Sequence, residues 1–198
     1  MFIELTDHLR CPADHDEAFL VLLPDQVEGR SVRTGTLGCP VCDRRFTLRE
    51  GVLDLGDAPP ARSGGAEVTR LSGEALAPLV GLSGPGGYLV LVGPPAAAWR
   101  DVAALLPGVG LVAVDPPPGV ADEDGISVLR GGRLPLKAHS MRGVVLGPPY
   151  GGDPAWVAEA ARVVLPGLRV VGEGVDPSPE TIDLMASAGG VWVGTRAR

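Results

Sequence analysis

The sequence lacks the features that would place it at a membrane or on a nucleic acid. No apolar run approaches the roughly 20 residues that a membrane-spanning helix needs. The N-terminus carries Glu4 where a signal peptide would carry basic residues. The formal net charge of −7 argues against broad binding to nucleic acids or anionic membranes through charge. These absences predict a soluble, cytoplasmic protein.

Aromatic residues and cysteines are also scarce. Aromatic residues make up 4% of the chain and hydrophobic residues 45%, so we expect a core built from Val, Leu and Ala. The three cysteines are Cys11, Cys39 and Cys42. An odd number of cysteines in a reducing compartment favours metal ligation over disulfide bonds.

The cysteine spacing predicts a structural zinc site. Cys39 and Cys42 form a Cys-Pro-x-Cys knuckle, in which two thiolates three residues apart can face one metal ion. A second pair of ligands should begin at Cys11. Asp14 holds the matching spacing, whereas His15 next to it offers the commoner partner for thiolates. We therefore predict Cys11, His15, Cys39 and Cys42 as the ligands, with Asp14 as the alternative to His15.

Short strand patterns surround these cysteines. They cover residues 18–23, 31–37, 45–48 and 50–55, with a turn predicted at 24–29. Residues 1–56 are therefore predicted to form a zinc ribbon. So small a sheet cannot be held together by its core alone, and metal binding should supply folding energy.

The same segment resembles the small zinc-ribbon activator family of methyltransferases, the partner subunit shared by tRNA, rRNA and translation-factor methyltransferases. The matching residues are Leu9-Arg10-Cys11-Pro12, Cys39-Pro40-Val41-Cys42, Phe46 and Arg49-Glu50-Gly51-Val52-Leu53. The chain departs from that family at the second ligand, where the family usually has cysteine. The resemblance implies a protein partner, because these activators bury apolar residues against a methyltransferase.

A Pro/Gly/Ser-rich stretch at 57–65 is predicted to be a linker, and strands alternate with helices in the remainder. The predicted strands are 88–92, 111–114, 126–129, 143–147, 168–172 and 191–194, and the predicted helices are 67–82, 96–106, 154–165 and 179–188, the last ended by Gly189-Gly190. Residues 66–198 should therefore form a three-layer, Rossmann-like α/β domain with a parallel sheet.

The first two of these strands end in residues that are typical of nucleotide-binding α/β domains. The strand from Tyr88 runs into Gly93, and the next strand ends at Asp115, where a ribose-binding acid would lie. The segment resembles class I S-adenosylmethionine-dependent methyltransferases, on Tyr88–Gly93 with Asp115, on residues 133–136 and 140–146, and on the corner Glu159-Ala-Ala-Arg-Val-Val-Leu-Pro-Gly167. That resemblance implies S-adenosylmethionine as cofactor, bound at Gly93 and Asp115.

The cofactor motif departs from the family, however. Pro94 and Pro95 follow Gly93 where the family has further glycines, and proline offers no N–H to a ligand. The carboxylate that would contact adenine is missing at 130–132, Arg142 replaces an aspartate, and a second Gly-Pro-Pro stands at 147–149. We therefore predict a non-catalytic, methyltransferase-like protein with no catalytic residue, acting as an accessory subunit of an enzyme or larger complex. The alternative is an active S-adenosylmethionine-dependent methyltransferase with an atypical turn.

Overall fold

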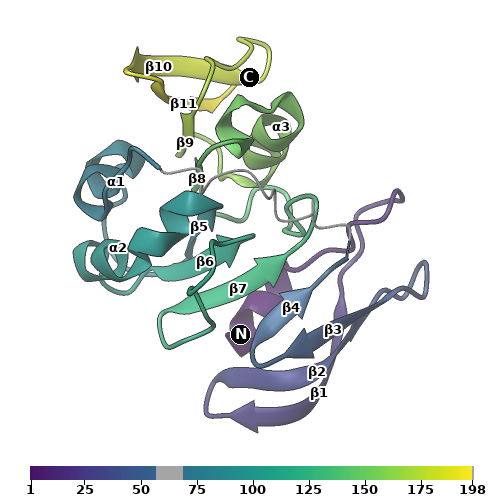
Figure 1. The fold of residues 1–198 in the computed structure, drawn as a ribbon. Helices are drawn as coiled ribbons and strands as arrows, with labels where there is room; N and C mark the ends of the chain where they lie inside the picture. The colour runs from purple at the N-terminus through teal and green to yellow at the C-terminus, as the bar shows by residue number, and fades with distance from the viewer. Residues whose placement is uncertain (57–68, 198) are drawn as a thin grey trace.

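A single 11-stranded sheet runs through the described part of the chain, in the order β1-β2-β3-β4-β7-β6-β5-β8-β9-β11-β10 (Figure 1). The structure is a computed structural model that describes residues 1–56 and 69–197. The predicted linker at 57–65 lies outside the described residues.

The helices and strands have the following bounds. The strands are β1 Val21–Glu28, β2 Ser31–Gly38, β3 Arg45–Arg49, β4 Val52–Asp54, β5 Tyr88–Val92, β6 Gly110–Val114, β7 Ile126–Arg130, β8 Gly143–Leu146, β9 Arg169–Glu173, β10 Ile182–Ala188 and β11 Val191–Arg196. The α-helices are α1 Gly73–Val80, α2 Trp99–Leu105 and α3 Pro154–Val163, and the short 3-10 helices are η1 Ile3–His8, η2 Pro94–Ala98 and η3 Tyr150–Gly152.

The C-terminal half of the sheet has a Rossmann-like α/β arrangement. Strands β7, β6, β5, β8 and β9 are parallel, and their short Val/Leu-rich runs are almost wholly buried, as in sheets covered on both faces. The order reverses between β5 and β8, which is the switch point where open α/β sheets bind ligands. The predicted α/β fold is confirmed here.

The N-terminal segment extends this sheet. Strand β4 pairs in parallel with β7, so that Val52 lies opposite Val128 and Asp54 opposite Arg130. The Arg10 amide also donates to the carbonyl of Pro135 at 2.9 Å. Because the two segments share hydrogen bonds and core, the N-terminal segment is docked on the α/β segment within one chain. The division of the chain into domains at 1–56 and 66–198 stays a prediction.

The two faces of the sheet are covered differently. Helices α1 and α2 pack on one face through Leu76, Val80 and Val102. Helix α3 and the N-terminal residues Met1, Leu5 and Leu9 belong to the core on the other face. The Met1 ammonium lies buried 2.6 Å from the Asp122 carboxylate, in the connection from β6 to β7. The N-terminus thus packs where that connection has no helix of its own.

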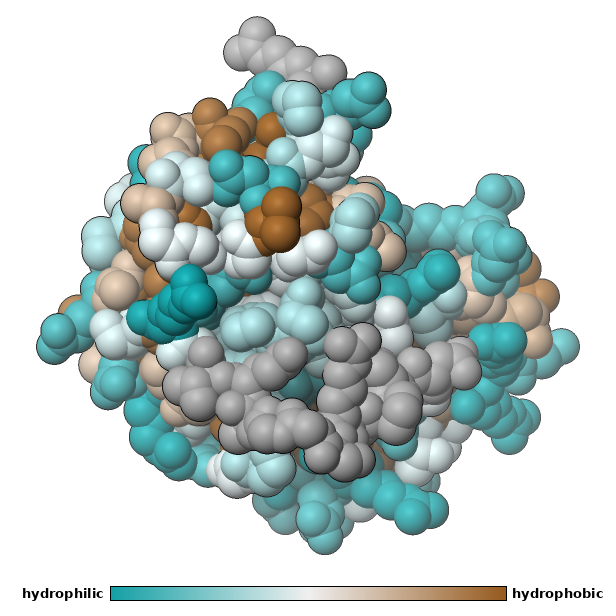
Figure 2. Space-filling view, turned by 45° about the horizontal axis from the view of Figure 1, so that its top comes forward, coloured by the Kyte–Doolittle hydropathy of each residue, from teal (hydrophilic) through white to brown (hydrophobic). Residues whose placement is uncertain are grey.

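The predicted helix at 179–188 is wrong, because Ile182–Ala188 is strand β10, paired antiparallel with β11. Gly189 and Gly190 have φ angles of 61° and 79°, which suit a two-residue hairpin turn rather than a helix end. Apart from Ile182, β10 is exposed. Figure 2 looks towards this end of the molecule, where apolar side chains lie among hydrophilic ones.

The turn predicted at 24–29 is also misplaced. Strand β1 continues through Pro24 to Glu28, with a register irregularity after Pro24. The reversal into β2 is confined to Gly29 and Arg30. Pro24 is tolerated because β1 is an edge strand, where a missing N–H need not leave a neighbour unpaired.

Candidate functional site

Four side chains of the types that can bind a metal ion converge in the N-terminal segment. The ligand atoms of Cys11, His15, Cys39 and Cys42 all lie within 4.8 Å of one another. Cys11 Sγ is 3.7 Å from Cys42 Sγ, and Cys39 Sγ is 3.4 Å from His15 Nε2. Tetrahedral zinc with bonds of about 2.3 Å to sulfur and about 2.05 Å to nitrogen would separate these atoms by about 3.8 and 3.6 Å. The donor set therefore fits a closed four-coordinate zinc site.

Local backbone geometry prepares Cys39 as a thiolate. Cys39 follows β2, and the Val41 amide donates to its sulfur at 3.4 Å. Burial opposes the thiolate, but the amide groups of Cys42 and Val41 together with the thiols of Cys11 and Cys42 outweigh it, so the pKa of Cys39 falls to about 7. Burial instead raises the pKa of Cys11 to about 11. Amide donors of this kind stabilise the charged form that a metal requires.

His15 is oriented with Nε2 towards the sulfur atoms. Its Nδ1 lies 2.6 Å from the Asp16 carbonyl, which assigns the proton to Nδ1 and leaves Nε2 free to bind. The same hydrogen bond is the first cause that raises the pKa of His15 to about 8. Asp14 is exposed and is not part of the cluster found among the described residues. The geometry therefore favours His15 over Asp14, and metal binding itself stays a prediction.

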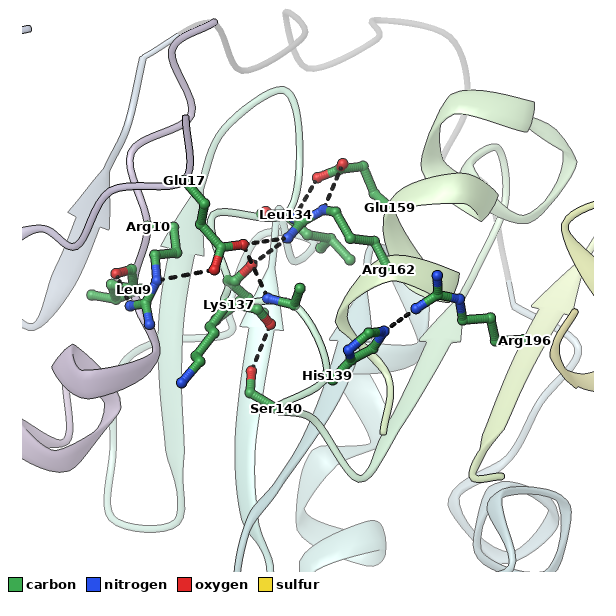
Figure 3. A network of polar contacts seen from close by, with 12 residues as sticks. Leu9, Arg10, Glu17, Leu134, Lys137, His139, Ser140, Glu159, Arg162 and Arg196 are labelled. Carbon is green, nitrogen blue, oxygen red and sulfur yellow. Dashed lines mark hydrogen bonds and ion pairs between the residues drawn. The ribbon is translucent and has the colours of Figure 1, made fainter. Parts of the chain in front are cut away.

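The loop that carries His15 is tied to the α/β segment through Glu17, whose role was not predicted from the sequence. Glu17 accepts from the Ala138 amide at 3.1 Å and lies 3.4 Å from Arg162. Arg162 on α3 donates to the carbonyls of Leu134 and Leu136 at 2.9 and 2.8 Å. Figure 3 shows this network. Nothing in the sequence marks Glu17 beyond its position two residues after His15.

Arg162 also pairs with Glu159 through two hydrogen bonds of 3.0 and 2.9 Å. The Glu-Ala-Ala-Arg corner recognised in the sequence thus fixes α3 to the preceding loop. In the same loop His139 is exposed and contacts Arg196 on β11 (Figure 3). These side chains therefore connect the loop with α3 and β11.

At the switch point, the turns after β5 and β8 pack against each other. A side chain at Gly147 would overlap Pro95 Cδ and lie 3.1 Å from Pro94 Cδ, and one at Gly93 would lie 2.6 Å from the ring of Tyr150. Tyr150 also contacts Trp156 edge-on, with ring centroids 4.7 Å apart. Proline and tyrosine rings therefore fill the space beside Gly93 at the strand ends.

Asp115, the other predicted cofactor residue, is held by the protein itself. Its Oδ1 accepts from the Gly131 amide at 3.0 Å, while Oδ2 is buried without a hydrogen-bond partner among the described residues. Burial raises the pKa of Asp115 to about 6, although the Gly131 amide acts in the opposite direction. Its φ of 47° is unusual for a residue with a side chain.

Arg142 stands where the resembled family has an aspartate. Its guanidinium donates to the carbonyls of Ser83, Gly84, Pro85 and Gly86 at distances from 2.6 to 3.2 Å. These bonds hold the loop between α1 and β5. Arg142 therefore has a structural task that an aspartate could not perform, since a carboxylate cannot donate.

No helix in the described ranges is long and apolar enough to cross a membrane.

No family model matches the sequence, and no curated protein matches it. Among solved structures, the chain is similar to the pyocyanin biosynthetic protein PhzM, with 16% identity and a TM-score of 0.45 over 64% of this chain and 55% of that one. A geranyl diphosphate methyltransferase in complex with SAM shares 17% identity, with a TM-score of 0.41 over 50% and 46%. A chain from the complex between the Haloferax volcanii Trm112 methyltransferase activator and a putative methyltransferase shares 22% identity, with a TM-score of 0.41 over 50% of each chain. The chain spans about half the length of these structures, and nothing about its activity follows from them.

Proposed function

We propose that this chain is a non-catalytic, methyltransferase-like protein that serves as an accessory subunit of an enzyme or larger complex. The observation that carries the proposal is the packing of the two Gly-Pro-Pro turns at the switch point. Pro94 and Pro95 lie against Gly147, and Tyr150 lies against Gly93, in the place where such sheets receive a ligand.

The backbone chemistry of this place supports the same conclusion. The four prolines of the two turns have no N–H to offer a cofactor. The Gly131 amide donates its hydrogen bond to Asp115, so this N–H is not available to a cofactor either. Each lost hydrogen bond weakens binding by about 1–3 kcal/mol, so losing several weakens it by orders of magnitude.

Calorimetry with S-adenosylmethionine tests this proposal. We expect no saturable heat at millimolar cofactor. Saturable binding at micromolar concentration would overturn it, and the Asp115→Asn variant serves as the matched control, because specific binding should depend on that carboxylate.

The second candidate is an active S-adenosylmethionine-dependent methyltransferase, favoured by the buried Asp115 Oδ2, which lacks a hydrogen-bond partner in the described part of the chain. A ribose hydroxyl would be a suitable donor to that oxygen. This candidate requires Tyr150 and the prolines to move away from the strand ends. It predicts micromolar binding in the wild-type chain and much weaker binding in the Asp115→Asn variant.

Within the proposed function, residues 1–56 are a zinc ribbon whose metal is structural. Four ligands leave no open position for a substrate, and the metal would join residues 11–15 to residues 39–42. Purified protein should contain about one equivalent of zinc. Less than half an equivalent in a folded ribbon would contradict the claim. The cytoplasm remains the predicted location.

A further inference from the structure

One face of the N-terminal sheet is exposed in the described part of the chain. We call it the outer face and define it by the side chains of Val21 and Leu23 on β1, Thr36 on β2, and Arg45, Thr47 and Arg49 on β3. In the register, Val21 is opposite Gly38 and Gly38 opposite Arg45, while Leu23, Thr36 and Thr47 form the next row. Directly opposed residues share a face, so these side chains point to the same side.

The opposite, inner face is already occupied. Leu37, Phe46 and Leu48 are buried in the core that also contains Met1 and Leu5. The segment's contacts with the rest of the chain are made there, at the edge of β4, which pairs with β7, and by the loop that carries Glu17. A surface for a partner must therefore be sought outside these contacts.

Exposure on the outer face is high for apolar residues. Val21 and Leu23 are 52% and 62% exposed. Figure 1 shows α1 and α2 over the Rossmann-like part of the sheet, away from β1–β3. Because the helices on this side of the sheet lie over the Rossmann-like half, the outer face has no second layer of described residues.

Five of the six arginines of the segment fall into two groups, and the sixth, Arg44, is exposed beside Arg45. Arg10, Arg30 and Arg33 each lie against a carboxylate, at 3.4, 2.5 and 3.0 Å from Glu17, Glu4 and Asp122. Arg45 and Arg49 are exposed and, among the described residues, form no ion pair or side-chain hydrogen bond. Asp54 on β4 lies opposite Thr47 in the register, and not opposite Arg45 or Arg49. The positive charges of Arg45 and Arg49 are thus available to a partner.

We propose that the outer face docks a partner protein that presents an apolar patch with carboxylates to one side of it. Val21 and Leu23 on the edge strand β1 would bury apolar area against the partner, and Arg45 and Arg49, two strands away on β3, would pair with its carboxylates. Arginine is one of the residues that are enriched at protein interfaces. A nucleic acid fits less well, because the residues that define the face include no aromatic ring for base stacking and the chain has a net charge of −7. This inference rests on the proposed accessory function.

Native affinity purification of the full chain, followed by mass spectrometry, supplies the partner for the test. The partner is then purified, and its Kd is measured for the wild type and for matched variants. Leu23→Thr and Arg49→Glu alter the outer face, while Met185→Thr and Arg133→Glu alter exposed residues elsewhere. Zinc content and thermal unfolding of each variant show that it is folded.

We expect each outer-face variant to raise Kd at least tenfold and each control variant to leave it within twofold. The Arg49→Glu loss should shrink as salt is raised, because screening weakens exposed charge pairs. Equal Kd values for face and control variants would overturn the docking site, as would recovery of nucleic acid, of a second copy alone, or of no partner. Calorimetry with S-adenosylmethionine on the same sample separates failure of the docking site from failure of the non-catalytic function.

Discussion

The Cys/His cluster and the switch point at the strand ends are both places where side chains converge, but they are built in opposite ways. In the cluster, Cys11 and Cys42 approach to 3.7 Å and present donors that fit a metal ion between them. At the switch point, proline rings occupy the space beside Gly147, and the ring of Tyr150 occupies the space beside Gly93. Convergence alone therefore does not identify a ligand site; the converging groups must also be spaced so that a ligand fits between them.

Of the changes that test this contrast, removing the metal should lower stability the most. Cys39→Ser or a strong chelator should unfold β1–β3 and lower stability by several kcal/mol, since structural zinc contributes folding energy directly. Thermal unfolding monitored with and without chelator measures the change. Asp14→Asn is the control, because Asp14 lies outside the cluster. A chelator-insensitive melting temperature would contradict the account.

Arg162→Met should have the next largest effect, lowering the free energy of unfolding by about 2–4 kcal/mol. The substitution leaves the carbonyls of Leu134 and Leu136 without their donor and Glu159 without its partner, and unsatisfied partly buried groups are costly. Urea unfolding compares it with Arg133→Met, an exposed arginine in the same loop. Similar midpoints for both variants would show that the network in Figure 3 contributes little.

Gly147→Ala tests whether the turns after β5 and β8 pack against each other. Its Cβ would overlap Pro95, and such overpacking typically costs about 1–3 kcal/mol. Gly38→Ala is a matched control, because nothing described lies within 4 Å of its added Cβ. If Gly147→Ala were as stable as Gly38→Ala, the two turns would not be packed as described.

Asp115→Asn should change the pH dependence of stability rather than lower stability at every pH. Burial raises the pKa of Asp115 to about 6, above its value of about 3.9 in unfolded chains. Between these values the native state binds more protons than the unfolded state, so its stability falls as pH rises. Relative to the Asp115→Asn variant, the wild type should lose about 1–3 kcal/mol between about pH 4 and pH 7. Urea midpoints at the two pH values measure this, and parallel pH curves would contradict it.

Local spacing was enough to predict that Cys39 and Cys42 lie together, because the knuckle brings both within one turn. Spacing alone matched Asp14 rather than His15, and His15 was chosen because imidazole is the commoner partner of thiolates. The parallel strands were also predictable, since buried apolar runs such as Tyr88–Val92 are characteristic of them. Strand β10 was missed because its exposed residues show no clear alternation, so Gly189-Gly190 was interpreted as a helix end. The packing of Tyr150 on Gly93 and the contacts of Glu17 join residues distant in sequence, which no local pattern encodes.

One calorimetric experiment addresses the contrast between the two regions directly. Metal-free chain is titrated first with zinc and then, once loaded, with S-adenosylmethionine. The account predicts saturable binding of about one equivalent of zinc and no saturable heat with S-adenosylmethionine up to millimolar concentration. Micromolar binding of S-adenosylmethionine that disappears in the Asp115→Asn variant would contradict it.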